Sequence, residues 1–297
     1  MEKLENCLCC GGSNQNLYLK LKDNYSSEDF NIVKCTDCGF LFTNPRPDTK
    51  EIGRYYVSPD YMSHTSHSRG LIQTIYRLAR KYMMRKKLGL IRDIVGKQDS
   101  FSLLDFGCGT GDFLGFVKQH GIVAEGVEPD AHAREIAQSV NHVDTYSIDD
   151  SLNLEAQKFD VITLWHVLEH VHQLHEQLDL FNKWLKPGGK LLIAVPNIES
   201  ADAGKYGKYW DALDVPRHLY HFSPSRLRQI VTQHNFSYVE QHPLFLDAYY
   251  VSMRSEWHMG TNKFIAYFKG FFSGLQSNRK AAQTGNYSSL IHVFTKK

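Results

Sequence analysis

The sequence predicts an α/β protein built on a doubly wound parallel sheet, with a small N-terminal metal-binding module. Two observations predict this fold class. From residue 101 onward, short apolar runs alternate with helical stretches, an order typical of parallel sheets covered by helices. Five of the cysteines lie in the first 38 residues, in two repeats of the form Cys-x-x-Cys-Gly.

Length and composition narrow the class of protein. The 297 residues are 42% hydrophobic and 22% charged, which excludes disordered and collagen-like chains. The formal net charge of +2 does not by itself indicate a nucleic-acid partner. No apolar run reaches the roughly 18 residues that a membrane span needs, and the polar first residues contain no secretory apolar core. We therefore expect a cytoplasmic protein.

The two cysteine repeats predict a structural zinc site in a zinc-ribbon module over residues 1–43. The expected ligands are Cys7, Cys10, Cys35 and Cys38. Four thiolates form the tetrahedral shell that structural zinc prefers, and disulfides are rare in reducing compartments. Cys9 could replace Cys7 or Cys10, and a cluster of free thiols is the alternative. The module is too short to bury its own core, so the metal would supply its folding energy.

Residues 44–98 are expected to form a helical linker or lid. A proline-rich turn at Asn44–Asp48 ends the first module, and residues 70–95 carry apolar side chains at helical spacing. Asp93 is the single acid against the basic residues Arg77, Arg80, Lys81, Arg85, Lys86, Lys87 and Arg92. Such a helix either lies on phosphate or anionic lipid, or is an ordinary solvated helix.

Residues 99–297 are expected to form one α/β domain. The expected strands are Ser102–Phe106, Val123–Val127, Val143–Tyr146, Asp160–Leu164, Lys190–Val195, Phe236–Gln241 and Ser288–Thr295. The expected helices are Asp112–His120, Asp130–Val140, His172–Trp184 and Ser223–His234. Residues 199–222 and 242–287 are expected insertions that contact substrate. The second contains an apolar stripe over 264–275, which predicts a core helix, a dimer face or a contact with a lipid-linked substrate.

The stretch Leu103–Leu114 carries the strongest chemical signal. A buried strand containing Asp105 runs into three alternate glycines, Gly107, Gly109 and Gly111, and then into a helix. Glycines let the backbone approach a ligand closely. Asp112 stands where the dinucleotide fingerprint has its last glycine, and its negative charge opposes a pyrophosphate. The acidic residue before the loop favours a cationic ligand instead.

These residues resemble the first motif of class I S-adenosylmethionine-dependent methyltransferases. Phe159–Val171 and Lys186–Asn197 resemble the family's fourth and fifth strands. The resemblance implies a Rossmann-like sheet with an antiparallel last strand, a loop that holds the methionine part, and a carboxylate on the ribose. The cofactor-binding residues that we expect are Asp105, Phe106, Gly107, Cys108, Gly109, Gly111, Phe113, Glu128, Pro129, Asp149, Asp150, Trp165 and His166; Asp149 or Asp150 would reach the adenine amine.

The segment His166–His170 has the H-x-x-E-H spacing of one metalloprotease family. It begins at a strand exit rather than on a helix, so we do not expect a catalytic zinc there. It also resembles the Glu-x-x-Glu-His stretch of ubiquinone-type O-methyltransferases, where a divalent ion can bind, although His166 replaces the first glutamate. We expect Trp165 and His166 to line the pocket at the carboxyl edge of the sheet.

The segment Trp210–Pro224 supplies candidate catalytic residues. His218 and His221 accompany Asp214, and a histidine can act as a general base near neutral pH. The segment is similar to the His-Glu-His-Leu-x-x-Phe-Ser stretch of zinc-ribbon-bearing nucleotide-sugar C-methyltransferases, which places His218 at the proposed base. Alternatively, both histidines pack and cap the helix that starts at Ser223. The catalytic candidates are His218, His166 and His221.

The sequence thus predicts an S-adenosylmethionine-dependent methyltransferase that acts on a small molecule, in first place a sugar, nucleotide-sugar or lipid-linked glycan. An RNA methyltransferase that uses the ribbon and the basic helix is one alternative, and binding would then weaken steeply with salt. A non-catalytic scaffold with the same fold is another. Peripheral membrane contact is compatible with the apolar stripe.

Overall fold

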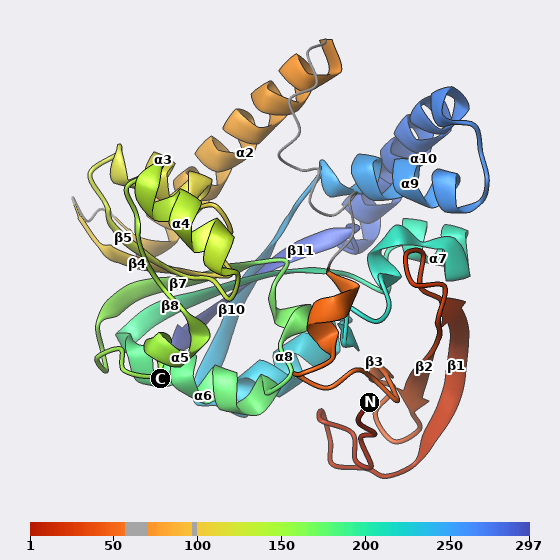
Figure 1. Cartoon of the computed structure of the whole chain (residues 1–297), viewed down its shortest axis with the longest axis horizontal. Helices are drawn as coiled ribbons and strands as arrows, with labels where there is room; N and C mark the ends of the chain where they lie inside the picture. Colours follow the sequence, from red (N-terminus) through yellow and green to blue (C-terminus); the bar gives the residue numbers. More distant parts are fainter. Residues whose placement is uncertain (57–70, 97–99) are drawn as a thin grey trace.

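The computed structural model describes residues 1–56, 71–96 and 100–297, and these residues form a seven-stranded central sheet of order β10-β11-β8-β7-β4-β5-β6 (Figure 1). Its strands are β4 (Ser102–Phe106), β5 (Val123–Val127), β6 (Asp144–Tyr146), β7 (Phe159–Trp165), β8 (Leu185–Pro196), β10 (Phe236–Pro243) and β11 (Ser289–Lys296). Strands β4 to β8 pair in parallel, whereas β11 pairs antiparallel with β8 and β10. The predicted doubly wound sheet with an antiparallel last strand is confirmed.

Helices cover both faces of the sheet because successive strand residues point to opposite sides. Leu103 of β4 packs in one core with residues of α2 and α3, and Leu104 packs in the other with residues of α6 and α8. The helices are α2 (Leu71–Val95), α3 (Asp112–Lys118), α4 (Ala131–Ser139), α5 (Ile148–Ser151), α6 (Leu174–Trp184) and α8 (Pro224–Thr232). Strand β8 begins earlier than expected, so the glycine turn at its start belongs to the strand.

A second sheet joins residues 1–43 (the cysteine module) to the segment Trp210–Pro224, which contains two of the catalytic candidates and which we call the catalytic segment. It consists of β1 (Gln15–Lys22), β2 (Asp29–Cys35), β3 (Leu41–Thr43) and β9 (Tyr220–His221). Leu41 pairs with His221, and Phe42 pairs with Tyr220. A free edge at β3 would expose unpaired backbone groups, and β9 covers it. The module therefore shares a sheet with the expected insertion at 199–222, which the sequence did not indicate.

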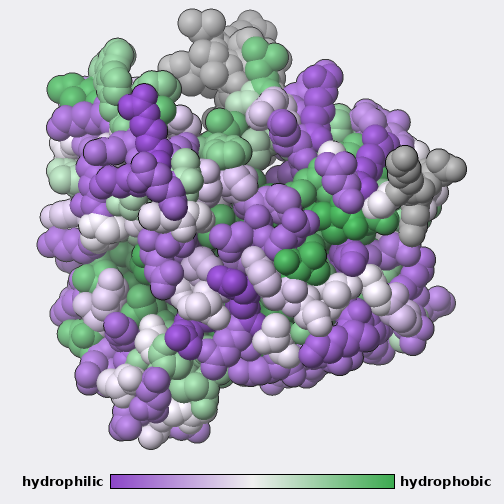
Figure 2. Space-filling model, turned by 180° about the vertical axis from the view of Figure 1, so that it is seen from behind, coloured by the Kyte–Doolittle hydropathy of each residue, from purple (hydrophilic) through white to green (hydrophobic). Residues whose placement is uncertain are grey.

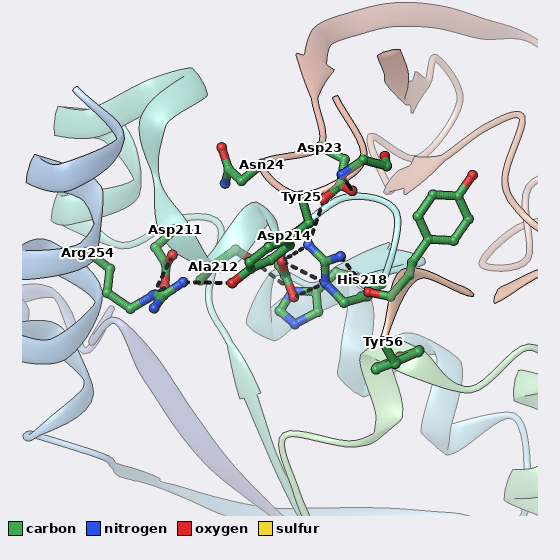
Figure 3. A network of polar contacts seen from close by, with 12 residues as sticks. Asp23, Asn24, Tyr25, Tyr56, Asp211, Ala212, Asp214, His218 and Arg254 are labelled. Atoms are coloured by element: carbon green, nitrogen blue, oxygen red, sulfur yellow. Dashed lines mark hydrogen bonds and ion pairs between the residues drawn. The ribbon is translucent and has the colours of Figure 1, made fainter. Parts of the chain in front are cut away.

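Arg217 forms ion pairs with Asp23 and Asp214 and so connects these two parts. Figure 3 shows these two acids facing each other across the network. Its Nη2 donates to Asp23 Oδ1 at 2.9 Å, and its Nε donates to both carboxylate oxygens of Asp214 at 3.0 Å. Nη1 donates to the carbonyl of Tyr55 at 3.0 Å, and the Tyr25 ring lies 4.8 Å from the guanidinium. Burial would raise the pKa of Asp214, but Arg217 and nearby histidines lower it. One cation therefore holds three chain segments.

The insertion at 242–287 forms two helices at one end of the molecule, α9 (Asp247–His258) and α10 (Lys263–Thr284) (Figure 1). The apolar stripe of α10 is exposed, so the expectation of a core helix is wrong. The short elements of the other insertion are α7 (Ala201–Tyr206) and the 3-10 turns η4 (Gly207–Tyr209) and η5 (Asp211–Leu213), and further 3-10 turns are η1 (Ile52–Tyr55) and η3 (Leu168–His170).

The expected basic helix is present as α2. The side chains of residues 71–77, which include part of its apolar stripe and Arg77, lie outside the described residues. Among the helices that the structure describes, none is long and apolar enough to cross a membrane.

We predict that Arg217→Met lowers the free energy of unfolding by about 3–5 kcal/mol, because it leaves the buried carboxylate of Asp23 and the half-buried carboxylate of Asp214 without their cation. Chemical denaturation followed by circular dichroism would measure this. Arg54→Met is the matched control, since Arg54 pairs with Glu28 at the surface and such pairs contribute up to about 1 kcal/mol. Equal losses for the two variants would contradict a central role for Arg217, whereas partial rescue by Asp23→Asn would support it.

Candidate functional site

The glycine-rich loop after β4 leaves open backbone at the carboxyl edge of the sheet. Gly107, Gly109 and Gly111 have φ angles of 77°, 55° and 74°, which disfavour any other residue. A Cβ at Gly107 would lie 2.4 Å from a methyl group of Val167, so a side chain there would clash with the segment after β7. A Cβ at Gly109 would meet no atom within 4 Å. The loop backbone is thus accessible at Gly109.

Glu128, at the end of β5, ties this loop to the next one. Its Oε2 accepts from the Gly109 N–H at 2.9 Å, and its Oε1 accepts from the Asp130 N–H at 3.0 Å. Burial raises the pKa of Glu128, although these amides oppose the shift. Each oxygen keeps a further lone pair that can accept a ligand hydroxyl. The two loops follow neighbouring parallel strands, where ligands of open α/β sheets bind.

Asp105, which is buried, and Lys87, which is half-buried, lie beneath the same edge. The Thr163 hydroxyl donates to Asp105 at 2.6 Å, and burial raises the pKa of Asp105 to about 7 even though Thr163 and Lys87 lower it. The Lys87 ammonium lies 4.0 Å from the ring centre of Trp165 and 5.6 Å from that of Phe113. Burial lowers the pKa of Lys87. The indole nitrogen of Trp165 has no hydrogen-bond partner among the described residues.

Lys87 was not among the expected site residues. We expected it to belong with the other basic residues of α2. Its spacing was the available signal, because Lys87 lies four residues after Met83 and four before Ile91, on the apolar face. A lysine on a buried helix face is rare unless it is paired or used.

The other expected cofactor residues differ in how they are placed. Phe106 packs in the core against Phe181, with ring centres 5.0 Å apart, so only its backbone is near the loop. Burial raises the pKa of the Cys108 thiol, which packs against Gly126. The Pro129 carbonyl accepts from Arg134 at 2.8 Å.

The two candidate adenine ligands lie on the short helix α5. Asp149 is exposed there, and Asp150 accepts from the Ser147 hydroxyl at 2.6 Å. Both side chains are exposed, but one oxygen of Asp150 is already engaged by Ser147 at the start of the helix.

His166 lies at the exit of β7 and is held as a cation. Its Nε2 lies 2.9 Å from Asp247, the first residue of α9, and its Nδ1 lies 3.5 Å from Glu169. Burial favours the neutral ring, but these two carboxylates outweigh that effect and raise the pKa of His166 to about 10. An imidazolium cannot accept a proton, so the geometry disfavours His166 as a base near neutral pH.

The Nδ1 atoms of His218 and His170 each face a backbone carbonyl. The Nδ1 of His218 lies 2.8 Å from the Ala212 carbonyl, and the Nδ1 of His170 lies 3.0 Å from the Arg217 carbonyl. A carbonyl only accepts, so each Nδ1 carries a hydrogen, and in the neutral form of each ring the Nε2 keeps a lone pair. Burial, reinforced by His218, lowers the pKa of His170 to about 4. The two rings meet edge to face, 4.7 Å between centres.

Glu169 completes this Glu–His–His group (Glu169, His170 and His218). One ligand atom from each residue lies within 4.8 Å of the others. Apart from the 3.5 Å ion pair of its Oε1 with His166, neither carboxylate oxygen of Glu169 has a partner in the described part of the chain. Burial would raise the pKa of Glu169, but the three neighbouring histidines lower it. The group therefore offers several acceptors and few protons, and it suits a hydroxyl donor or a divalent cation.

His221 lies apart from the Glu–His–His group in its contacts. It is buried in β9, with Nε2 3.3 Å from the Thr43 hydroxyl of the cysteine module. Burial lowers the pKa of His221 to about 3, so it is neutral near pH 7. The hydroxyl of Ser223, rather than either histidine, caps α8.

The four predicted metal ligands come together in the cysteine module. The sulphur atoms of Cys7 and Cys38 are 3.6 Å apart, as are those of Cys10 and Cys35, and all four lie within 4.8 Å of one another. In each repeat the glycine N–H donates to the carbonyl of the first cysteine at 2.8 Å. Cys9 is buried outside this cluster. The donor set fits one tetrahedral zinc ion.

Known proteins share this architecture. A family model described as a methyltransferase domain matches residues 60–241. The chain is 30% identical over 103 residues to a ubiquinone biosynthesis O-methyltransferase of Coxiella burnetii, a match that covers 32% of this chain and 43% of that protein. The mitochondrial counterpart of Rattus norvegicus is 31% identical over 105 residues, which is 32% of this chain and 30% of that one. The matches thus span less than half of these relatives.

A solved structure supports the fold. The geranyl diphosphate C-methyltransferase of Streptomyces coelicolor, in complex with Mg²⁺, geranyl diphosphate and S-adenosylhomocysteine, superposes with a TM-score of 0.52 at 14% identity. The superposed part covers 81% of this chain and 90% of the chain in that structure. The structural likeness shows that this chain shares the fold of that solved methyltransferase. Because the family model matches more than half of the chain, the chain belongs to the methyltransferase family.

Proposed function

We propose that this protein methylates a hydroxyl-bearing small molecule, in first place a sugar or nucleotide-sugar, with His218 as the general base. The Glu–His–His group is the observation that carries the proposal. Two of its members, Glu169 and His170, follow β7 closely, and Val167 just before them lies against Gly107 of the cofactor loop. The hydroxyl groups of a substrate would donate hydrogen bonds to the carboxylate oxygens and imidazole nitrogens of the group. The resemblance of Trp210–Pro224 to nucleotide-sugar C-methyltransferases supports the substrate class.

The residues of the carboxyl edge fit S-adenosylmethionine. The open backbone at Gly109 would lie against the methionine part, and the free lone pairs of Glu128 would accept both ribose hydroxyls. Asp149 is the better of the two candidates for the adenine amine, because Asp150 is already engaged by Ser147. Lys87 is placed to pair with the methionine carboxylate. Bound there, the cofactor supplies a methyl group already activated by its positive sulphur.

The chain itself then contributes positioning and one proton transfer. His218 Nε2 would accept the proton of the substrate atom that receives the methyl group. The substrate atom would then take the methyl group that the cofactor supplies, and the electron pair of the broken carbon–sulphur bond would stay on the cofactor sulphur. Glu169 would stabilise the imidazolium that results on His218. In-line positioning supplies most of the acceleration, and a positioned base contributes about 10²–10⁴-fold.

A divalent cation is a second occupant that the same three side chains fit. One carboxylate and two imidazole nitrogens form a mixed donor set typical of transition metals. The ubiquinone-type resemblance supports this reading, whereas His166 replaces the first glutamate of that motif. Held as an imidazolium, His166 would not be a ligand.

We also propose that Cys7, Cys10, Cys35 and Cys38 bind one structural zinc ion. Four thiolates leave no open coordination position, so this metal would stabilise the module and take no part in methyl transfer. The module in turn contacts the catalytic segment through β9 and Arg217. Residues 1–43, 44–98 and 99–297 remain our proposed division of the chain.

Glu128→Ala should weaken S-adenosylmethionine binding by about 10- to 100-fold, because it removes two charge-assisted hydrogen bonds. Calorimetry would measure the affinity. Glu135→Ala, on the exposed face of α4, is the matched control and should bind normally. Unchanged affinity in Glu128→Ala would overturn the ribose assignment.

Metal analysis of the purified chain should find about one zinc ion, and Cys35→Ser should lose it together with thermal stability. Cys9→Ser should retain the metal, because Cys9 lies outside the four-sulphur cluster. A full equivalent of zinc in Cys35→Ser would show that the ligand set is wrong.

The substrate proposal is tested first by thermal shift with S-adenosylhomocysteine, alone and with nucleotide-sugars or total RNA. We expect nucleotide-sugars to add to the cofactor shift, and His218→Asn to lower the turnover of the identified substrate about 10²–10⁴-fold with cofactor affinity unchanged. His221→Asn should lose much less.

Other outcomes would redirect the proposal. Activity abolished by EDTA and restored by Mg²⁺ or Zn²⁺ would favour the cation at the Glu–His–His group. A response limited to salt-sensitive RNA binding would favour an RNA substrate. Full activity of His218→Asn would overturn the base assignment.

A further inference from the structure

Helix α10 exposes its large apolar side chains and buries its small ones. The exposed face, which we call the α10 face, consists of Phe264, Ile265, Phe268, Phe271 and Phe272. The exposed fractions of Phe264, Phe268 and Phe272 are 79%, 70% and 65%. Hydrophobic surface is visible at this end of the molecule, at the upper left in Figure 2. Contiguous exposed patches of this kind mark interaction sites.

The packing of α10 on α9 fixes this orientation. A Cβ on Gly270 would lie 2.5 Å from the backbone of Met253, and one on Gly274 would lie 2.8 Å from the backbone of Tyr249. Ala266 is also fully buried on this side. Spacings of four between small residues allow helices to approach this closely. A rotation of α10 that buried a phenylalanine would place the ring where even a methyl group has no room.

The charges around the α10 face are positive. Helix α10 contains no acidic residue, whereas Lys263, Lys269, Arg279 and Lys280 are exposed. Arg279 continues the stripe at helical spacing, eleven residues after Phe268.

A shallow groove beside the face adds to this charge. It is lined by Lys205 and Lys269 together with Phe268 and Phe272. Both ammonium groups share the single carboxylate of Glu256, at 4.0 and 3.9 Å. One positive charge therefore remains without a counter-charge of its own in this groove.

We propose that the α10 face docks on a bilayer surface that contains anionic phospholipid. Aromatic side chains would enter the boundary between headgroups and acyl chains, and the lysines and Arg279 would contact lipid phosphates. A second copy of the chain fits less well. A two-fold contact between α10 helices would bring their basic residues together, and α10 has no acidic residue to pair with them.

Docking here would place the proposed site next to the membrane. Helix α9, on which α10 packs, begins at Asp247, and Asp247 binds His166. The α10 face and the carboxyl edge of the sheet are thus connected through one helix. The docking proposal does not depend on which substrate is methylated.

Flotation of the full chain with lipid vesicles tests the proposal. We expect binding to vesicles of phosphatidylcholine with added phosphatidylglycerol, much weaker binding to phosphatidylcholine alone, and release by salt. The double variant Phe268→Ser/Phe272→Ser should bind at least tenfold less. Leu17→Ser/Val239→Ser is the matched control, since it removes two exposed apolar side chains from β1 and β10. It should bind as the unaltered chain does.

Thermal midpoints and cofactor affinity should be unchanged in both double variants, which shows that they fold. Equal binding by the two double variants, or no binding to anionic vesicles, would overturn the proposal. So would a stable dimer that Phe268→Ser/Phe272→Ser dissociates, because a second copy would then cover the face.

Discussion

The buried guanidinium of Arg217 is the interaction on which the arrangement of the candidate site depends. It neutralises Asp23 of the cysteine module and Asp214 of the catalytic segment, and His218 is the next residue. The Arg217 carbonyl accepts from His170. The same residue therefore joins two modules by its side chain and orients a site histidine by its backbone. The cysteine module thus helps to fix the positions of the His170 and His218 imidazoles, as the sheet does.

Much of the sheet could be predicted because its signals are local. The alternation of apolar runs and helices, and the glycines after Asp105, encode strand β4, its turn and helix α3 within a few residues. The edge pairing of β3 with β9 could not be predicted in this way. It joins residues that are distant in sequence, and β9 is only two residues long. The orientation of α10 also escaped prediction, because apolar periodicity shows that a helix has two faces and does not show which face is buried.

The candidate site likewise contains residues that local sequence patterns indicate and residues that only the folded chain brings together. Glu128 and the loop glycines occupy the expected edge because parallel strands place their carboxyl ends together. His218 was a candidate by resemblance, but its neighbours Glu169 and His170 belong to another segment. That segment resembles a metalloprotease motif and the Glu-x-x-Glu-His stretch of ubiquinone-type O-methyltransferases, and neither resemblance pointed to His218 as a neighbour. Lys87 and Asp247 reach the site from helices outside the core motifs. Their roles follow from three-dimensional packing, which brings charged groups from four segments around β7.

The pairing of β3 with β9 has a consequence for synthesis on the ribosome. His221 lies roughly 180 residues after Leu41, so at about 5–20 residues per second the ribosome needs about ten to forty seconds to deliver the partner strand. During that interval the nascent ribbon presents an open strand edge, and Phe40 and Phe42 lack Tyr220 and Phe222. Until β9 emerges, the nascent N-terminal segment is thus prone to associate with other chains. Chaperone capture of stalled nascent chains would be concentrated at this edge.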